Sequence, residues 1–223
     1  MQALEQLRAR MASCPDGTPD NETLRWYLRD RSCDVVEAHA KLTKMLSWRR
    51  DFSRGSITEA MVAAERATGK SCVHSAPDVY GRPAILITAR LHATGEFPLL
   101  ASKRLCVSII DEAISRLPSG PGSRGGSAGV HGEQIVGVFD LRGFQIPRNA
   151  DFVFAAFMVE AFFEYYPKRV GQVLFVDAPW VFGPAWEVIR PLMRKYAALV
   201  RFVSIDELKR EFFTPETLPL VFK

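Results

Sequence analysis

The sequence has no long hydrophobic run. Its longest apolar stretch, "FVFAAFMVEAFF", covers only residues 152–163 and contains a glutamate, whereas a transmembrane helix needs about 20 apolar residues. The first residues, "MQALEQLRARMA", lack the apolar core of a secretory signal. We therefore expect no membrane-spanning helix and no secretory signal, and a cytoplasmic location.

Cysteine and histidine are scarce, and neither is clustered. No two of the 4 cysteines have the C-x-x-C spacing of a redox or metal site. The 4 histidines are isolated from one another and from any cysteine at ligand spacing. The sequence therefore predicts free thiols and no metal site.

The motifs of several enzyme classes are missing as well. There is no G-x-S-x-G, no H-E-x-x-H, and no G-x-G-x-x-G after a strand. Asp140 and Asp177 follow predicted strands, where paired carboxylates would suit acid–base catalysis. Each also precedes a turn, however, and aspartates in turns commonly bind local backbone N–H groups. We favour this structural role and expect no catalytic residue, no enzymatic activity and no cofactor.

Positive charge is present without any Lys/Arg-rich block. Lys and Arg number 29 against 25 Asp and Glu, which gives a formal charge of +4. This modest basicity is compatible with an anionic membrane surface. Nucleic-acid binding usually requires a clustered basic patch or a known motif, so we expect no nucleic-acid partner.

Residues 1–55 have the pattern of a small antiparallel helical bundle. Asp20 or Asn21 is placed to cap one apolar-periodic run, and Ser32 or Asp34 begins the next. A short Asp-containing turn joins the two runs, as in an αα-hairpin. We predict an N-terminal helical module here, and a second domain over residues 56–223.

In this second domain, strand-like and helical segments alternate. Strands are predicted at 83–91, 134–141, 172–178 and 201–205, with helices at 99–117, 150–167 and 183–200. This order predicts an α/β fold with a mixed or parallel sheet covered by helices. Pro191 predicts a kink in the last of these helices. The Gly/Ser-rich segment 118–133 is predicted to be a flexible surface insertion.

Two of the predicted helices have unusual surfaces. The helix over 152–166 is apolar around most of its axis, which indicates burial on two sides, against the sheet and against either protein or an apolar ligand. Beyond it, Arg190, Arg194 and Arg201 follow at helical spacing beside a second apolar flank. Such a helix suits anionic headgroups on one side and acyl chains on the other. Core packing and a solvated basic face remain the alternatives.

An ordered set of short motifs runs through the chain. It comprises "LRWYLR" (24–29), "DV" (34–35), "WRR" (48–50), "DVYGRP" (78–83), "DLRG" (140–143), "YYP" (165–167), "DAP" (177–179) and "LP" (218–219). In order and spacing, the set resembles the CRAL-TRIO, or Sec14-like, family of lipid-binding proteins. The resemblance covers roughly residues 20–220.

The resemblance implies a sheet floor under helices that enclose one apolar pocket, with a mobile helix gating its entrance. The implied activity is lipid binding and transfer between membranes by a monomer that meets an anionic membrane surface transiently and peripherally. We predict that the lipid contacts Phe154, Phe157, Met158, Phe175, Phe182, Trp186, Ile189 and Met193. Membrane contact is predicted for Arg190, Arg194 and Arg201.

Two departures from the family pattern concern the lipid headgroup. Phosphatidylinositol-transferring members have an acidic residue after Tyr-Tyr-Pro and a lysine after the gate, where this chain has Lys168 and Val200. Phosphatidylcholine-binding members have two hydroxyl residues where this chain has Ile135 and Gly137. We therefore expect a more apolar ligand than this standard pair. The alternative is a regulatory interaction module whose pocket is filled by side chains, and a cavity of several hundred Å³ would distinguish the two.

Overall fold

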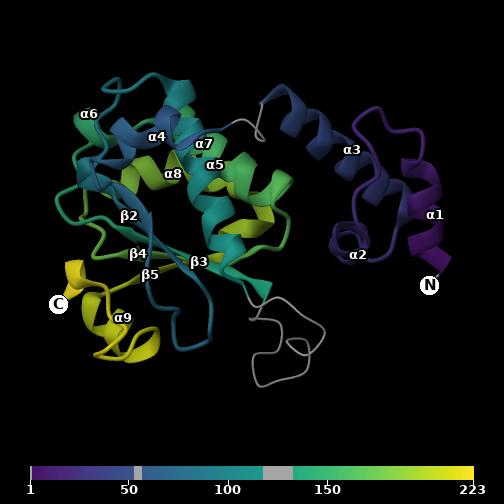
Figure 1. Ribbon diagram of the computed structural model, residues 1–223. Helices are drawn as coiled ribbons and strands as arrows, with labels where there is room; N and C mark the ends of the chain where they lie inside the picture. Colours follow the sequence, from purple (N-terminus) through teal and green to yellow (C-terminus); the bar gives the residue numbers. More distant parts are fainter. Residues whose placement is uncertain (1, 53–56, 118–132) are drawn as a thin grey trace.

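An N-terminal group of helices packs beside an α/β core (Figure 1). The computed structural model describes residues 2–52, 57–117 and 133–223. The predicted domain boundary near residue 55 and nearly all of the predicted insertion at 118–133 lie outside the described residues. Both remain predictions.

The N-terminal helices are α1 (Gln2–Met11), α2 (Asn21–Asp30) and α3 (Val35–Asp51). Asp20 caps α2 by accepting a hydrogen bond from the backbone N–H of Thr23, and Asp34 caps α3 by accepting from that of Glu37. Apolar side chains without exposed surface fill the centre of the group: Leu7, Met11, Leu24, Leu42 and Met45. The predicted bundle is confirmed, with α1 as an additional member.

One mixed sheet forms the core. Its strands are β1 (Ser71–Val73), β2 (Ala84–Thr88), β3 (Ile135–Asp140), β4 (Val170–Val176) and β5 (Val200–Val203), in that spatial order. β1 pairs antiparallel with β2, and every other neighbouring pair is parallel. The predicted α/β fold with a mixed sheet is confirmed. β1 was not predicted because it is short and follows a glycine-containing turn.

Helices cover both faces of the sheet. They are α4 (Glu59–Arg66), α5 (Leu99–Ser115), α6 (Ile146–Asn149), α7 (Phe152–Glu160), α8 (Phe182–Met193) and α9 (Ile205–Glu211). Short 3₁₀ segments are η2 (Ala89–Leu91), η5 (Arg194–Leu199) and η6 (Leu220–Phe222), and η4 (Ala161–Tyr165) is a π-helical turn. In Figure 1, α5, α7 and α8 lie above the sheet and α9 lies below it.

Alternating side chains divide the sheet between two apolar cores. Val138 and Leu174 face α9, together with Phe212. Ile85 and Phe175 face the opposite side, where α5, α7 and α8 pack. Because successive residues of a strand point to opposite faces, each strand contributes to both cores.

The predicted helix over 183–200 ends early. α8 continues through Pro191, but Arg194 takes φ +48°, a region that non-glycine residues rarely adopt, and η5 follows. The missing N–H of Pro191 removes one helical hydrogen bond near this end. Arg201 belongs to β5. The continuous helical spacing expected for Arg190, Arg194 and Arg201 is therefore wrong.

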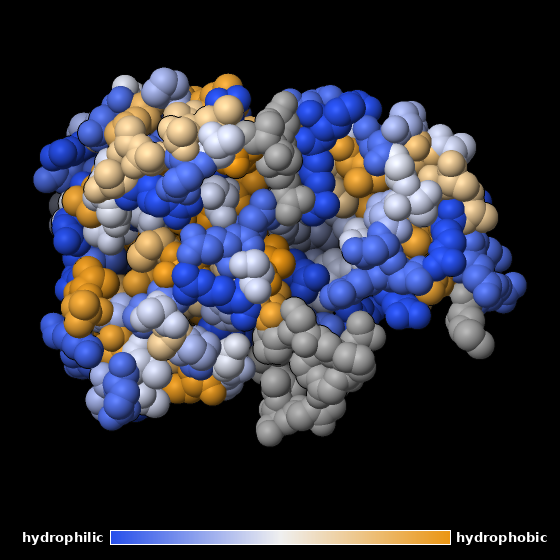
Figure 2. All heavy atoms as spheres, viewed as in Figure 1, coloured by the Kyte–Doolittle hydropathy of each residue, from blue (hydrophilic) through white to orange (hydrophobic). Residues whose placement is uncertain are grey.

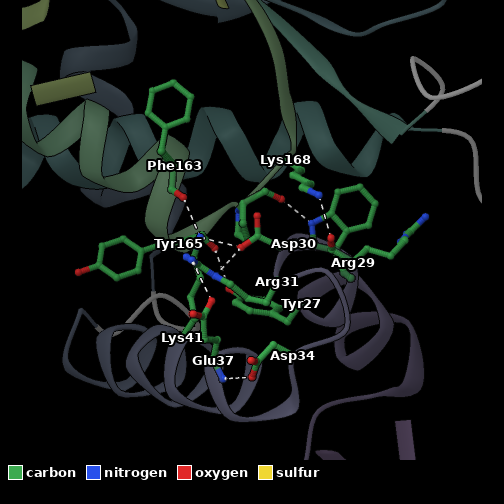
Figure 3. A network of polar contacts seen from close by, with 12 residues as sticks. Tyr27, Arg29, Asp30, Arg31, Asp34, Glu37, Lys41, Phe163, Tyr165 and Lys168 are labelled. Carbon is green, nitrogen blue, oxygen red and sulfur yellow. Dashed lines mark hydrogen bonds and ion pairs between the residues drawn. The ribbon is translucent and has the colours of Figure 1, made fainter. Parts of the chain in front are cut away.

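The N-terminal helices are attached to the core at the π-helical turn η4. The Lys41 ammonium lies 2.9 Å from Asp30 Oδ2 and donates to the carbonyl oxygen of Phe163 at 3.2 Å. Figure 3 shows side chains of α2 and α3 converging on this turn. Nearby, the ring of Trp48 stacks on Tyr165 with centroids 4.0 Å apart. Polar and aromatic contacts thus join the two parts of the molecule.

Candidate lipid-binding pocket

A cavity lies between the sheet and helices α5, α7 and α8. The cavity volume is about 180 Å³, or about 1340 Å³ when the space at its open mouth is included. The smaller value is similar to an engineered apolar cavity of about 150 Å³ that binds benzene. It is below the roughly 300–1,000 Å³ of drug-sized ligand pockets. The described space thus admits an acyl-chain segment, whereas a whole diacyl lipid requires the walls to widen.

The walls of this cavity are almost entirely apolar. Strands β2, β3 and β4 form the floor with Ile85, Ile87, Phe139, Val173 and Phe175. The helices add Leu105, Ile109, Phe154, Ala155, Met158, Phe162, Phe163, Phe182, Ala185, Ile189 and Met193. Such walls favour acyl or other hydrocarbon surface, which gains about 25 cal/mol for each Å² removed from water.

Most of the predicted pocket residues meet at this cavity. Those that line it are Phe154, Met158, Phe175, Phe182, Ile189 and Met193. Phe157 instead packs toward the N-terminal helices, where its ring stacks on Phe52 with centroids 5.9 Å apart. Trp186 packs edge-on against Phe175 and Phe202, with centroids 5.5 Å from each, and is not among the lining residues. A lipid contact of any of these residues remains a prediction.

The residues that β2 and α5 contribute to the cavity walls were not predicted from the sequence. The signal was present, since Ile85 and Ile87 alternate in β2, and Leu105 and Ile109 lie one turn apart in α5. The sequence alone does not say which face of each element turns toward a cavity, because that depends on strand order and helix packing.

The predicted membrane-contact arginines lie on two sides of the sheet. Arg190 is exposed on α8 and pairs with Glu187 at 3.0 Å, and Arg194 is exposed just after α8. Arg201 pairs with Glu211 at 3.0 Å and lies over the ring of Phe212, on the α9 side. The structure therefore separates Arg201 from the other two.

An exposed tryptophan precedes α8. Trp180 is 87% exposed, and Val188 and Leu192 of α8 are also exposed. On the face shown in Figure 2, hydrophobic residues form separate small areas among hydrophilic ones. The region around α8 thus combines exposed apolar side chains with the exposed Arg190 and Arg194. Trp180 was not among the residues predicted to contact the membrane.

The two aspartates considered for catalysis bind other groups of the chain. Asp140 accepts hydrogen bonds from the backbone and the guanidinium of Arg142, and it pairs with Arg90 at 3.2 Å. Burial acts to raise the pKa of Asp140, but these bonds and charges hold it below its usual value. Asp177 accepts from the backbone N–H of Ile205 at 3.2 Å. Asp140 thus has the local structural role that its turn predicted, whereas Asp177 binds a backbone N–H of a distant segment.

The headgroup positions of the family offer little to a charged or hydroxylated ligand. Lys168 donates to the backbone carbonyl of Arg29 at 2.8 Å, and Val200 begins β5. On β3, Ile135 is buried, and a side chain at Gly137 would meet the ring of Phe139 at 3.4 Å. These positions contain neither the acidic residue nor the hydroxyl pair of the family pattern.

A family model of the CRAL/TRIO domain matches residues 66–220. The chain belongs to the CRAL/TRIO family. It is 28% identical to a CRAL-TRIO domain-containing protein of Schizosaccharomyces pombe, over 91% of this chain and 47% of that protein. It is 25% identical to the phosphatidylinositol transfer protein CSR1 of Eremothecium gossypii, over 91% of this chain and 46% of that protein.

Two further comparisons agree with the family. The chain is 25% identical to the SEC14 cytosolic factor of Eremothecium gossypii, over 91% of this chain and 68% of that protein. The crystal structure of Sfh5 matches with a TM-score of 0.72 and 13% identity, over 94% of this chain and 79% of that one, which confirms the fold. The chain spans about half the length of the first two relatives. The family's role is lipid binding and transfer.

None of the helices in the described ranges has the length and apolar character needed to span a bilayer. Within the same ranges, no three His, Cys, Asp or Glu side chains are grouped so that they would hold a metal ion.

Proposed function

We propose that this chain binds one apolar lipid in the cavity under α8 and transfers or presents it between membranes, without covalent chemistry. The observation that supports this is an apolar cavity between the sheet and α5, α7 and α8 in a CRAL/TRIO family member. An acyl segment that buries 100 Å² there gains about 2.5 kcal/mol. Binding of this kind needs no catalytic group.

The proposed ligand is more apolar than phosphatidylinositol or phosphatidylcholine. A phosphate headgroup near Tyr-Tyr-Pro would meet Lys168, whose ammonium already donates to the backbone carbonyl of Arg29. An inositol ring would find Lys168 at the position where the family pattern has an acidic partner. A choline headgroup would meet Ile135 and Gly137 instead of hydroxyl groups. A polar headgroup buried without hydrogen bonds costs about 1–3 kcal/mol or more, which disfavours both lipids.

The proposed membrane contact is made by the region around α8. Trp180 would enter the interface between headgroups and acyl chains, where tryptophan is enriched. Arg190 and Arg194 would meet anionic headgroups. Arg201 lies on the other side of the sheet, so the proposal rests on the first two arginines. The association would be transient and peripheral, by a monomer on the cytoplasmic side.

The test is mass spectrometry of the organic extract of the purified, non-denatured chain, before and after incubation with mixed liposomes. We expect close to one lipid per chain, with one fatty acyl or isoprenoid class dominant. A transfer assay between donor and acceptor vesicles then distinguishes transfer from storage. An extract that stays empty after incubation contradicts lipid binding.

The second candidate is a regulatory interaction module of the same fold. The observation that favours it is the modest size of the cavity, whose volume is about 180 Å³. Phe154, Phe162 and Phe163 take up part of the space under the helices. An empty extract together with an unchanged fold would support this candidate.

A further inference from the structure

One end of the apolar cavity is polar. Five side chains from separate elements meet there, and we call them the polar corner: Glu65, Lys70, His92, Ser102 and Asp151. Lys70, His92, Ser102 and Asp151 line the cavity. Glu65 contacts Lys70 and Ser102 and is only 1% exposed. Neither the family motifs nor the headgroup positions discussed above include any of these residues.

The hydrogen bonds of the polar corner determine where the His92 proton lies. Lys70 forms an ion pair with Glu65, and Ser102 Oγ donates to Glu65 Oε1 at 2.5 Å. Lys70 Nζ also lies 3.1 Å from His92 Nδ1. An ammonium only donates, so Nδ1 of His92 must accept. Neutral His92 therefore carries its proton on Nε2.

The Nε2–H group of His92 is buried and makes no hydrogen bond within the described residues. Asp151 Oδ2 lies 3.6 Å from it, which is too long for a hydrogen bond. The other Asp151 oxygen caps α7 by accepting from the backbone N–H of Phe154 at 2.9 Å. The His92 ring also stacks on Phe154, with centroids 5.5 Å apart, which fixes its orientation. A buried donor and a carboxylate oxygen are thus fixed close together at the cavity wall.

The charges of the polar corner disfavour an anion. Glu65 and Lys70 neutralise one another, while Asp151 adds a negative charge. Burial and the positive charge of Lys70 lower the pKa of His92, so its ring is neutral at neutral pH. The corner therefore has a net negative charge of one before any ligand enters.

We propose that the polar corner binds a single uncharged hydroxyl group at the end of an otherwise apolar ligand. This inference rests on the proposed function and names its ligand class. The hydroxyl oxygen accepts from His92 Nε2–H and donates to Asp151 Oδ2. Since these two atoms are 3.6 Å apart, one oxygen can lie within hydrogen-bond distance of both. A carboxylate would be repelled by Asp151, and an alkane would leave the His92 donor unpaired.

The test is displacement of the uncharged fluorophore N-phenyl-1-naphthylamine from the full chain by three ligands of equal length: hexadecan-1-ol, hexadecane and hexadecanoate. We expect the alcohol to bind about tenfold more tightly than the alkane, since its hydroxyl satisfies the buried Nε2–H of His92, which the alkane leaves unpaired. Hexadecanoate is expected to bind more weakly than the alcohol.

Two variants and a control locate the effect. H92F keeps a ring that can stack on Phe154 but removes Nε2–H, and we expect the tenfold preference for the alcohol to fall to about twofold or less. D151N keeps a side chain that can cap α7 but loses the charge, so hexadecanoate should gain relative to the alcohol. H39F changes a histidine of α3, outside the cavity, and should leave the preference unchanged.

The outcomes separate this inference from the proposed function. Equal binding of alcohol and alkane, or tightest binding of hexadecanoate, would overturn the inference and leave apolar lipid binding intact. Binding of none of the three ligands would contradict both. If circular dichroism shows that H92F does not fold, the response of D151N to hexadecanoate decides the matter.

Discussion

The Lys41 ammonium lies 2.9 Å from the Asp30 carboxylate, and only 5% and 6% of these two side chains are exposed. The pair joins α3 to the end of α2, and its third partner, the Phe163 carbonyl, belongs to the core. Burial lowers the pKa of Lys41, while the contact with Asp30 acts in the opposite direction. The position of the N-terminal helices on the core therefore depends on a buried charge that stays paired.

Replacing Lys41 by methionine should destabilise the protein by about 1–3 kcal/mol, because the buried Asp30 carboxylate and the Phe163 carbonyl lose a charged donor, while Asp30 keeps its ion pair with Arg31 at 3.1 Å. The measurement is urea unfolding at pH 7. Lys44 on the same helix is the matched control, since it is 55% exposed and lies 4.0 Å from Glu160. K44M should change the free energy of unfolding by about 0.5 kcal/mol or less. Equal effects of K41M and K44M would show that the Asp30 pair does not matter.

Asp140 should make stability depend on pH at the acid end. Its pKa is lower in the folded chain than in the unfolded one, because the hydrogen bonds and charges of Arg142 and Arg90 outweigh burial. Its stabilising contribution is therefore complete above the unfolded value of about 3.9, and it is lost as pH falls through that value toward the folded one.

D140N should accordingly lower the free energy of unfolding by about 2 kcal/mol at pH 7. The gap between D140N and the native chain should narrow when urea unfolding is repeated at pH 3. D206N, at an exposed position of α9, should change stability little at either pH. A gap for D140N that is the same at both pH values would contradict the argument.

The fold was predictable wherever local signals were strong. Asp20 and Asp34 precede apolar-periodic runs, and each does cap a helix. The strands before Asp140 and Asp177 were visible as apolar runs that end at turns. The helix predicted over 183–200 ended early, because the backbone leaves the helical conformation at Arg194, whereas the strand predicted at 201–205 corresponds to β5. There, pairing of β5 with β4 decides the structure.

The cavity was only partly predictable, because its walls come from distant parts of the sequence. The aromatic-rich sequences of α7 and α8 indicated that Phe154 and Phe182 line a pocket. Nothing in the local sequence distinguished them from Phe157, whose ring packs against Phe52 instead. His92 was noted in the sequence only as one of four isolated histidines. Its proximity to Lys70 and Asp151 arises because the segments just after η2, just before β1 and just before α7 meet in the fold, and no sequence pattern records it.

Membrane contact around α8 should be sensitive to Trp180 and to the nearby arginines. R190E/R194E should reduce binding to anionic vesicles by about 30-fold or more, since each basic residue near such a surface contributes about 1 kcal/mol. W180A should weaken binding to anionic and to neutral vesicles alike. Co-sedimentation at low and high salt is the measurement, and only the arginine-dependent part should fall with salt.

R210E is the control for charge, because Arg210 is exposed on α9, on the other side of the sheet. It reverses one charge without touching the region around α8. If R210E reduced vesicle binding as much as a single R190E, net charge rather than the surface around α8 would control the association.

Filling the cavity should weaken lipid binding while the fold is kept. Ile189 lines the cavity from α8 and is only half-buried. I189W therefore places an indole ring in a cavity of about 180 Å³. We expect the lipid recovered in the organic extract to fall by more than half, because the ring occupies the volume that an acyl segment needs.

The neighbouring V188W is the matched control, since Val188 is exposed and does not line the cavity. It adds the same ring to the same helix and should leave the extract unchanged. Overpacking costs about 1–3 kcal/mol, so the melting temperature of I189W must be measured alongside. A folded I189W that retains a full complement of lipid would place the ligand elsewhere in the molecule.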